Sequence, residues 1–549
     1  MPSIAVTVAR ALAADGIAVA FGVVGAGNIM SVAGLTAAGV RYVPARHEGG
    51  AVTMADAYFR VAGEVAVATT TYGAGFANTV SALAEAVRHR SGLVLLCGDA
   101  PESGRRRFDV DQSAICAGAG AHVIRLRSDT DPAAAAREAV RYAHRYQHPV
   151  VLCLPFDLSG APAPEPAGTS PVHAGGRPML PAAPAAAIDA VASALAGAHR
   201  PLIIGGLGAW RSGAADVLGR LADRSGALLA TTVMANGMFA RHPWSVGICG
   251  GFASPRAADL IGAADVVVAF GATLDRFTLR DDRLLHPGAL LISVNVDGPP
   301  PVDRIDLDVT GDAATVAAGM LERWQLLDAP VSGWRAEVAD DIAKLGWADE
   351  PYAEASATGR IDPRTLSIAL ATMLPEERTV VLDGGHFIAW PSMYWPVPDP
   401  SGFVFTGSAF QAIGMGFAGA AGAAAGRTDR TTVVALGDGG ALMGLSELDT
   451  LIRTAGSAVV VVYDDGAYGY EVHMFGPVGA DLATATFGET DFAGIARALG
   501  ATAVTVRSVD DLAALRAWRD AGARGTLMLD CKVVRDVVAD FLAEIVAAR

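Results

Sequence analysis

The chain has 549 residues, 52% of them hydrophobic, and a formal net charge of −15. This length exceeds what one core can bury and predicts several domains of roughly 100–200 residues each. The acidic balance and the lack of a long Lys/Arg block exclude nucleic acid and anionic membrane surfaces as partners. The five scattered cysteines form no CxxC pair, and the N-terminus has no basic signal-peptide region. Free cysteines in a cytoplasmic protein are therefore expected.

Strand-like and helix-like segments alternate along the chain, which predicts an α/β fold with parallel sheets. The first set, residues 1–160, contains the strands VAVATT, LVLLCG and VVLCLP. A Pro/Gly/Ala-rich stretch at 159–178 is typical of a linker. The second set covers 180–328, and the third covers 360–549 after an irregular charged stretch. We expect three domains of similar size, each a parallel β-sheet flanked by helices.

Two glycine-rich stretches need separate interpretation. The segment LIIGGLGAW (202–210) has the strand and glycine turn of a dinucleotide-binding fingerprint, but its third glycine and an acidic ribose ligand are missing. A structural turn is favoured, with a nicotinamide-dependent dehydrogenase as the weaker alternative. The most apolar long stretch, 409–426, is rich in Gly and Ala and contains Gln411. It predicts a buried helix of a soluble protein rather than a membrane span.

Acidic residues end two apolar strands of the third set. In TTVVALGDGG (431–440) the apolar strand ends in an acid, Asp438. In VVVVYDDGAYG (459–469) the valines are followed by Asp464 and Asp465. A helical segment separates them, so the three elements form a β-α-β unit. Its crossover usually places the two strands side by side and parallel, with both carboxyl ends at one edge. Ligands bind at such edges in α/β proteins.

Two carboxylates at one edge require a compensating charge. A hard divalent cation such as Mg²⁺ supplies it, keeps several non-protein ligands and favours phosphate oxygens. The glycines after Asp438 leave room for a phosphate at the amides that begin the next helix. The segment therefore predicts a metal–diphosphate site, against the alternative of two unrelated Asp-Gly turns.

GDGG and YDDGAYG at this spacing resemble the paired motifs of thiamine diphosphate (ThDP) enzymes. The chain as a whole resembles acetolactate synthase-like large subunits of the pyruvate oxidase/acetohydroxyacid synthase group. The resemblance implies that Mg²⁺ is bound by Asp438, Asp465 and the backbone carbonyl of Ala467. The diphosphate would lie against Gly437, Gly439 and Gly440. The family usually has Asn at positions 464 and 465, so we expect a more acidic site whose diphosphate binding depends more on the metal.

Further segments resemble other parts of the same family. RHEGGAVTMADAYFRVAG (46–63) resembles its pyrimidine-binding helix, which implies that Glu48 hydrogen-bonds the aminopyrimidine ring and promotes formation of the C2 ylid. TTTYGAGFAN (69–78), with Gly73, resembles a substrate-side loop. LDGGHFIAW (382–390) and SAFQAIGMGFAG (408–419) resemble segments that contact the cofactor. The residues implied in these two segments are Gly384 and His386 at the diphosphate, Ile413 as the wedge under the cofactor and Gln411 through its carbonyl. FAD in the central domain is possible in this family, but no motif indicates it here.

The resemblance implies an enzyme that attacks a 2-oxo acid, decarboxylates it and ligates the carbanion-enamine to a second carbonyl, an aldehyde or ketone. Glu471 lies where simple 2-oxo acid decarboxylases have a catalytic Glu, and Gln112 and His473 are further pocket candidates. A simple decarboxylase is the alternative, although Ala26 stands where those enzymes have an acid. A ThDP-binding protein without turnover is another alternative, and the sequence does not separate these activities from C–C hydrolysis. The family's sites lie between subunits, so a homodimer or homotetramer is expected.

Overall fold

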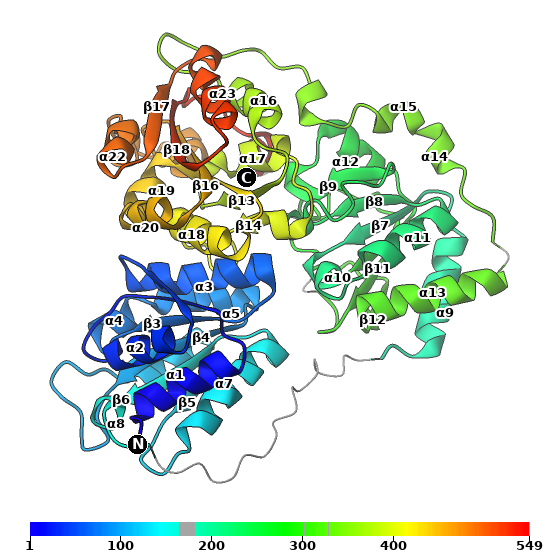
Figure 1. The fold of residues 1–549 in the computed structure, drawn as a ribbon. Helices are drawn as coiled ribbons and strands as arrows, with labels where there is room; N and C mark the ends of the chain where they lie inside the picture. The colour runs from blue at the N-terminus through cyan, green and yellow to red at the C-terminus, as the bar shows by residue number, and fades with distance from the viewer. Residues whose placement is uncertain (164–181, 301, 328, 548–549) are drawn as a thin grey trace. The chain divides into compact units, whose positions relative to one another are not determined.

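A computed structural model describes residues 1–163, 182–300, 302–327 and 329–547. The linker expected at 159–178 lies outside these ranges from residue 164 onward. Within the described chain there are three six-stranded parallel sheets flanked by helices (Figure 1), which confirms the predicted fold class. Two compact units are present, each built from separate stretches of chain. The first unit comprises Met1–Pro178, Thr379–Ile388 and Val404–Arg535, and the second comprises Met179–Arg378, Ala389–Phe403 and Asp536–Arg549.

The first sheet, in the first unit, has the strand order β2-β1-β3-β4-β6-β5. Its central strands are apolar and buried on both faces, as expected for parallel strands covered by helices. The strands are β1 (Val19–Gly22), β2 (Arg41–Pro44), β3 (Ala66–Thr70), β4 (Leu93–Asp99), β5 (His122–Arg125) and β6 (Val150–Pro155). The helices are α1 (Ile4–Ala14), α2 (Ile29–Ala37), α3 (Glu48–Ala62), α4 (Ala74–Ala77), α5 (Val80–His89), α6 (Gln112–Ala119), α7 (Pro132–Tyr146) and α8 (Phe156–Ser159).

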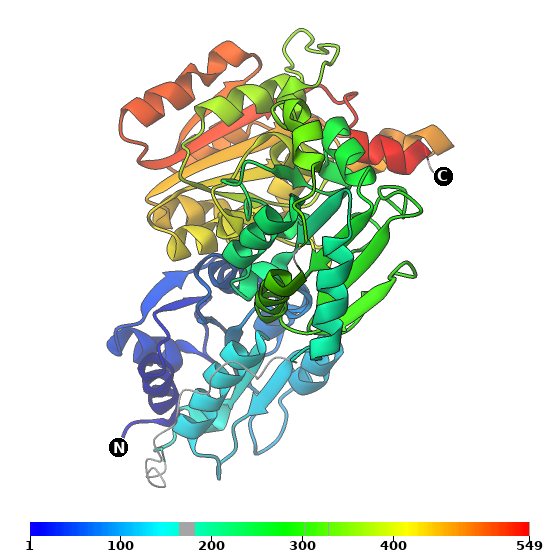
Figure 2. The same ribbon diagram turned by 90° about the vertical axis from the view of Figure 1, so that its right-hand side faces the viewer.

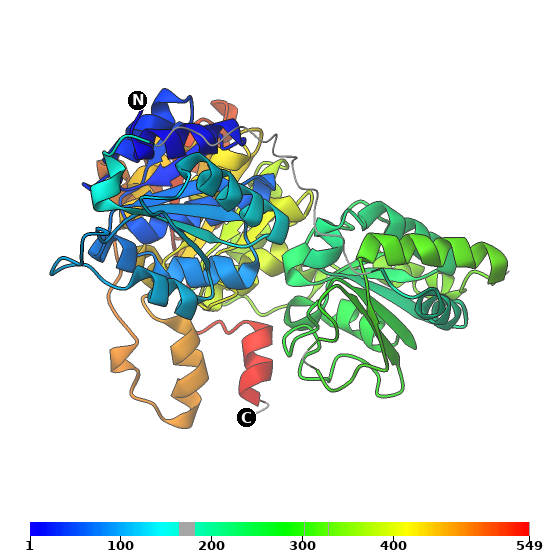
Figure 3. The ribbon, with the colours of Figure 1, turned by 90° about the horizontal axis from the view of Figure 1, so that it is seen from below.

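The third sheet, in the same unit, has the order β14-β13-β15-β16-β18-β17, and helices cover both of its faces (Figure 2). Its strands are β13 (Arg378–Leu382), β14 (Phe403–Phe405), β15 (Thr431–Gly437), β16 (Ser457–Asp464), β17 (Thr502–Val506) and β18 (Gly525–Lys532). The helices are α18 (Gly416–Gly426), α19 (Asp438–Met443), α20 (Ser446–Thr454), α21 (Gly469–Phe475), α22 (Phe492–Ala498) and α23 (Ala513–Asp520). The segment with α21, orange in Figure 3, projects from this sheet.

The helix expected over 409–426 is shorter than predicted. It begins only at Gly416, and the preceding residues form a turn in which Gln411 has φ +58° and Gly414 has φ +86°. Both values lie in the left-handed region, which interrupts a right-handed helix. The described residues contain no helix that is long and apolar enough to cross a membrane.

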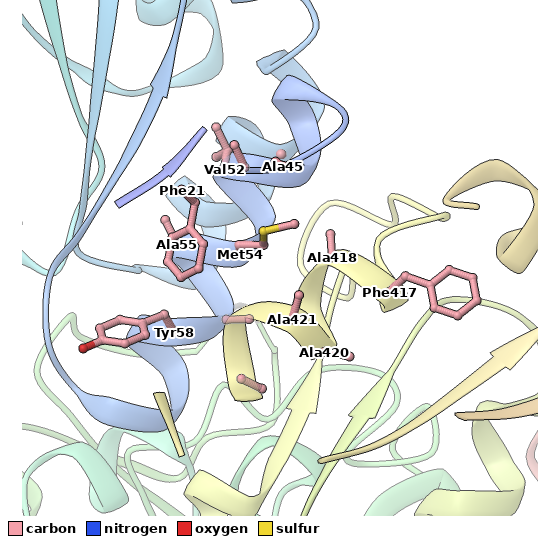
Figure 4. Packing of buried hydrophobic residues seen from close by; sticks show 14 of the residues in the cluster. Phe21, Ala45, Val52, Met54, Ala55, Tyr58, Phe417, Ala418, Ala420 and Ala421 are labelled. Carbon is pink, nitrogen blue, oxygen red and sulfur yellow. The ribbon is translucent and has the colours of Figure 1, made fainter. Parts of the chain in front are cut away.

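Helices α3 and α18 pack closely and join the first and third sheets within the first unit. Met54 of α3 lies beside the alanines of α18, including Ala418 and Ala421 (Figure 4). A Cβ at Gly422 would lie 2.2 Å from the Met54 carbonyl oxygen, so only glycine fits at this crossing. Small residues on α18 therefore allow the close approach of the two helices.

The second unit contains the sheet β12-β11-β10-β7-β8-β9. Its strands are β7 (Pro201–Gly205), β8 (Leu228–Thr231), β9 (Ser245–Ile248), β10 (Val266–Phe270), β11 (Leu290–Asn295) and β12 (Leu307–Thr310). Its helices are α9 (Ala185–Ala196), α10 (Leu207–Arg211), α11 (Ala215–Ser225), α12 (Pro255–Gly262), α13 (Ala313–Leu327), α14 (Trp334–Glu337), α15 (Ala339–Ile342), α16 (Pro363–Met373), α17 (Ala389–Tyr394) and α24 (Asp540–Ala547).

Two details of the second unit bear on its role. In the LIIGGLGAW turn, Gly208 N–H donates to the Gly271 carbonyl at 2.9 Å, and a Cβ at Gly206 would lie within 2.7 Å of the Gly271 backbone. Backbone packing therefore accounts for the glycines. The last helix, α24, belongs to this unit, where the Phe541 ring lies 5.4 Å from that of Phe252 and 6.1 Å from that of Phe277.

Candidate active site

The carboxyl ends of β15 and β16 bring acidic side chains to one edge of the third sheet. The two strands are adjacent and parallel, as expected for the β-α-β unit. Asp438 is buried, and its Oδ2 accepts a hydrogen bond from Gly466 N–H at 2.8 Å. Asp465 Oδ1 accepts one from Ala467 N–H at 3.0 Å. The turn after β16 therefore folds over Asp438 and brings the two carboxylates named by the sequence motif together.

Electrostatics at this edge favour a cation. Burial, and then the neighbouring carboxylates of Asp465 and Asp464, raise the pKa of Asp438 to about 8. The ionised form is therefore costly until a positive charge arrives. Within the described chain, no group of three or more His, Cys, Asp or Glu side chains could hold a metal ion by itself. This donor set suits a hard cation that takes its remaining ligands from backbone carbonyl, water and phosphate oxygens, as Mg²⁺ does.

Asp464 has a partner that the sequence analysis missed. Lys532 lies opposite Asp464 in the register of β16 and β18, and its Nζ is 2.6 Å from Asp464 Oδ2. The same Nζ lies 2.8 Å from Asp530 Oδ1 and donates to the Thr490 carbonyl at 2.6 Å. Burial opposes its charge, but the two carboxylates outweigh this and raise the pKa of Lys532. The extra acidity expected from Asp464 is thus offset locally.

The turn after Asp465 is fixed by a second cation. Arg535 donates to the carbonyls of Asp465 and Gly466, both at 2.9 Å. At the start of α21, a Cβ on Gly469 would lie 2.6 Å from Asp465 Oδ2. The side chain of Asp465 is therefore confined between its own turn and α21.

Asp383, also missed from sequence, holds the glycine segments predicted to contact the cofactor. Its Oδ1 accepts hydrogen bonds from Gly384 N–H at 2.8 Å, Gly414 N–H at 3.0 Å and Met415 N–H at 3.3 Å. Burial raises the pKa of Asp383 to about 6, against the lowering effect of these bonds. Because this carboxyl lies between the two loops, it fixes the 411–415 turn, and with it Ile413, relative to the end of β13.

Ile413, Gly384 and Gly440 form a compact apolar corner. Ile413 is 47% exposed, so its side chain is open to a ligand. A Cβ on Gly384 would lie 3.1 Å from Ile413 Cγ1, and one on Gly440 would lie 3.2 Å from Ile413 Cγ2. A Cβ on Gly439 would meet the Tyr468 ring at 2.6 Å. The absence of a Cβ at these positions leaves room for the Ile413 side chain and the Tyr468 ring, and places the backbone amides that begin α19 next to the exposed Ile413.

Two buried imidazoles lie beside this corner. The ring centroids of His386 and His473 are 4.6 Å apart, and the ring planes are inclined at 61°. Burial, followed by the neighbouring His473, lowers the pKa of His386 to about 3, so His386 is neutral at physiological pH. Glu471 lies on the same helix as His473 but is exposed. The two side chains therefore occupy different faces of α21.

Glu48 begins α3 in the first domain and is partly exposed. Its Oε2 accepts a hydrogen bond from Asn78 Nδ2 at 3.0 Å. The start of α3 is held from the third domain: Glu447 of α20 accepts bonds from Arg46 N–H at 3.0 Å and His47 N–H at 2.8 Å. Across the described residues, no hydrogen bond joins Glu48 to the acidic edge of β15 and β16. A single chain thus leaves the Glu48 carboxyl and the acidic edge as separate parts.

Gln112 and Gly73 are brought together in the first domain. Gly73 has φ +62°, and its N–H donates to Gln112 Oε1 at 3.1 Å. The buried Gln112 also donates to the Gly98 carbonyl at 3.0 Å. Gln112 therefore positions the loop instead of presenting its amide to solvent. Asn28 acts similarly, with its Nδ2 donating to the Val23 carbonyl at 3.0 Å.

Comparison with known sequences identifies the class of protein. Three models of the thiamine pyrophosphate enzyme family match the chain: the N-terminal TPP binding domain at residues 3–117, the central domain at 188–320 and the C-terminal TPP binding domain at 383–530. Together they cover most of the chain, which therefore belongs to the thiamine pyrophosphate (ThDP) enzyme family. The acidic edge and the corner around Ile413 fall within the C-terminal match, and Glu48 falls within the N-terminal one.

Particular relatives match over nearly the full length. A sulfoacetaldehyde acetyltransferase of Castellaniella defragrans is 28% identical over 537 residues, covering 91% of this chain and 88% of its own length. A probable acetolactate synthase large subunit of Methanocaldococcus jannaschii is 26% identical over 535 residues (92% and 87%). A putative acetolactate synthase large subunit of Mycobacterium tuberculosis is 29% identical over 486 residues (85% and 86%). The chain is thus similar to acetolactate synthase-like enzymes.

Proposed function

We propose that this protein is a ThDP- and Mg²⁺-dependent carboligase that decarboxylates a 2-oxo acid and joins the resulting acyl unit to a second carbonyl compound. The observation that carries the proposal is the acidic edge, where the turn after β16 brings Asp465 beside the buried Asp438 and next to the glycines that begin α19. Relatives named as acetolactate synthases and as sulfoacetaldehyde acetyltransferases support transfer of a two-carbon acyl unit.

The described residues fit both groups. Asp438, Asp465 and the carbonyl of Ala467 would hold Mg²⁺, whose remaining positions are left for water and diphosphate oxygens. Backbone at Gly384 and Gly440 would face the diphosphate, with Ile413 beneath the linked rings. Bound ThDP supplies a carbon nucleophile and an electron sink for the decarboxylated acyl unit. The protein supplies binding, orientation and proton transfer.

Proton transfer is assigned to carboxyl groups. Glu48 would hold a proton at its carboxyl oxygen against the aminopyrimidine ring, with Asn78 fixing the orientation of that carboxyl. The neutral imidazole of His386 would donate one N–H to a phosphate oxygen. Glu471, exposed on α21, would meet the bound substrates only if another part of the assembly covers this helix. In a covered site, Glu471 would protonate the product. In an uncovered one, it would take no part in the reaction.

A second copy of the chain would complete the site. Glu48 has no bond to the acidic edge of its own chain, and apolar side chains are exposed around both half-sites. Those of the first domain are Val24, Ile29, Met30 and Phe108, and those of the third domain are Phe410, Ile413, Leu442, Met443 and Phe475. Exposed apolar surface at two such places is typical of an interface. The proposed assembly is a homodimer, or a tetramer made of two dimers.

The test is a product analysis. Purified protein is incubated with ThDP, Mg²⁺ and a panel of 2-oxo acids, alone and paired with aldehydes or ketones, and the acid-quenched mixtures are read by proton NMR. A 2-hydroxyketone or an acetohydroxyacid is expected. Glu48→Gln is the matched control, because it keeps the shape of the side chain while removing the acid, and should reduce the rate by about 10²-fold or more.

The other outcomes are specific. Free aldehyde as the only product refutes carboligation and makes the protein a simple decarboxylase, for which Glu471→Gln is the next variant. If ThDP binds but no donor of the panel is consumed, deuterium exchange at C2 of the bound cofactor is measured next. Exchange that is equally slow in wild type and in Glu48→Gln refutes turnover, whereas faster exchange in wild type means that the panel misses the substrate.

A further inference from the structure

A buried row of charges lies directly behind the acidic edge. Asp464 at the end of β16 is 0% exposed and Lys532 at the end of β18 is 3% exposed. Lys532 Nζ lies between Asp464 Oδ2 at 2.6 Å and Asp530 Oδ1 at 2.8 Å. Its third interaction is with the Thr490 carbonyl at 2.6 Å. Lys532 Nζ therefore donates hydrogen bonds to Asp464 and to the Thr490 carbonyl and forms an ion pair with Asp530, so this buried ammonium group is held from three sides.

Asp464 is close enough to the acidic edge to interfere with it. One N–H, that of Gly466, lies 2.8 Å from Asp438 Oδ2 and 3.2 Å from Asp464 Oδ1. The two carboxyl groups therefore meet at a shared donor. Asp465 follows Asp464 directly in the chain, so three carboxylates surround one turn. An Asp464 without a counter-charge would be available as a third carboxylate ligand.

Stability alone does not explain the row. Buried ion pairs repay their desolvation poorly, and replacing such a pair by apolar residues is often neutral or stabilising. Here the pair lies next to a site whose affinity depends on the number and charge of its carboxylate ligands. A fixed ammonium group at this place limits how many carboxylates a cation meets.

We infer that Lys532 is a positioning residue of the cation site: it holds Asp464 outside the coordination shell, so that the cation binds two carboxylates and keeps open positions for a diphosphate. This inference rests on the proposed cation site. Arg535 completes the arrangement, because its bonds to the carbonyls of Asp465 and Gly466 keep the turn from following Asp464. Cation binding without ThDP is weak as a result, and the diphosphate supplies the missing ligands.

Mn²⁺ binding to the full-length protein tests this, with electron paramagnetic resonance measuring free Mn²⁺ in the absence of ThDP. Lys532→Met should bind Mn²⁺ about tenfold more tightly than wild type, because Asp464 becomes a third carboxylate ligand. Adding Asp464→Asn to that variant should return the affinity to within about threefold of wild type, and Lys532→Arg, which keeps the charge, should stay in the same range. A merely structural lysine predicts the opposite sign, since a loosened site binds the cation more weakly.

Unchanged or weaker Mn²⁺ binding by folded Lys532→Met overturns the inference. If circular dichroism shows that this variant does not fold, Asp464→Asn decides alone. If Lys532 keeps Asp464 away from the cation, Asp464→Asn binds Mn²⁺ within about threefold of wild type. If Asp464→Asn loses as much Mn²⁺ affinity as Asp465→Asn, Asp464 is itself a ligand and the inference is overturned.

Asp438→Asn separates this inference from the proposed function. If Asp438→Asn leaves Mn²⁺ binding in the presence of ThDP unchanged, the proposed cation site itself is wrong. If Asp438→Asn weakens that binding while Lys532→Met has no effect, only the role of Lys532 is wrong.

Discussion

Replacing Gly422 by alanine should destabilise the protein, although alanine is the better helix former. In the middle of α18 the substitution gains about 1 kcal/mol of helix propensity. The new Cβ would lie 2.2 Å from the Met54 carbonyl oxygen and 2.7 Å from the Met54 Cα, both backbone atoms of α3. These contacts are roughly 1 Å shorter than ordinary ones, and the helices must separate. Overpacking costs about 1–3 kcal/mol, and contacts with backbone atoms place this site at the upper end of that range. After the gain in helix propensity, we expect a net loss of about 2 kcal/mol.

Gly118 provides a matched control. It also lies within a helix, α6, but a Cβ there would meet nothing within 4 Å. Gly118→Ala should therefore stabilise the protein by up to about 1 kcal/mol. Thermal and urea unfolding, followed by circular dichroism, should move in opposite directions for the two variants. A Gly422→Ala protein as stable as Gly118→Ala would refute the steric argument.

Two further predictions concern the site. Mixing inactive Glu48→Gln and Asp438→Asn subunits should restore about a quarter of wild-type activity, because half of the dimers carry one intact site between chains; no recovery after verified subunit exchange would mean that the site lies within one chain. Burial raises the pKa of Asp383 from 3.8 to about 6 in the folded protein, so the folded state holds the proton of this carboxyl up to a higher pH than the unfolded state does. The corresponding stability is present below pH 3.8 and is lost as the pH rises through about 6, for a total of about 3 kcal/mol. Urea unfolding between pH 4 and 7 should show this fall in wild type but not in Asp383→Asn, and parallel profiles would contradict it.

The parallel sheets and the acidic edge followed from local sequence patterns. Runs of buried valine and leucine mark the strands, and the β-α-β connection requires that Asp438 and Asp465 end at one edge. No contact with a remote residue is needed for that conclusion. The remaining site residues, including Glu48, were predicted from the resemblance to the family's motifs.

Residues that act across the fold could not be found in this way. Lys532 becomes relevant only through the pairing of β16 with β18, which places it opposite Asp464. Asp383 looks like a strand-end residue until the 411–415 turn packs on it. That turn was itself expected to be helical, because the left-handed conformation of a non-glycine residue such as Gln411 has no clear local signal.

The course of the chain between the two units has a consequence for protein synthesis. The second unit is complete only when α24 has added Phe541 beside Phe252 and Phe277. Domains that are contiguous in sequence can fold one after another as they leave the ribosome. Here the second unit, which contains the middle of the chain, can complete its folding only after α24 has been synthesised. Helix α24 follows every residue of the candidate site in the sequence. Nascent chains stalled before residue 540 should therefore hold an unfinished second unit, with the surface meant for Phe541 open to chaperones and to proteases.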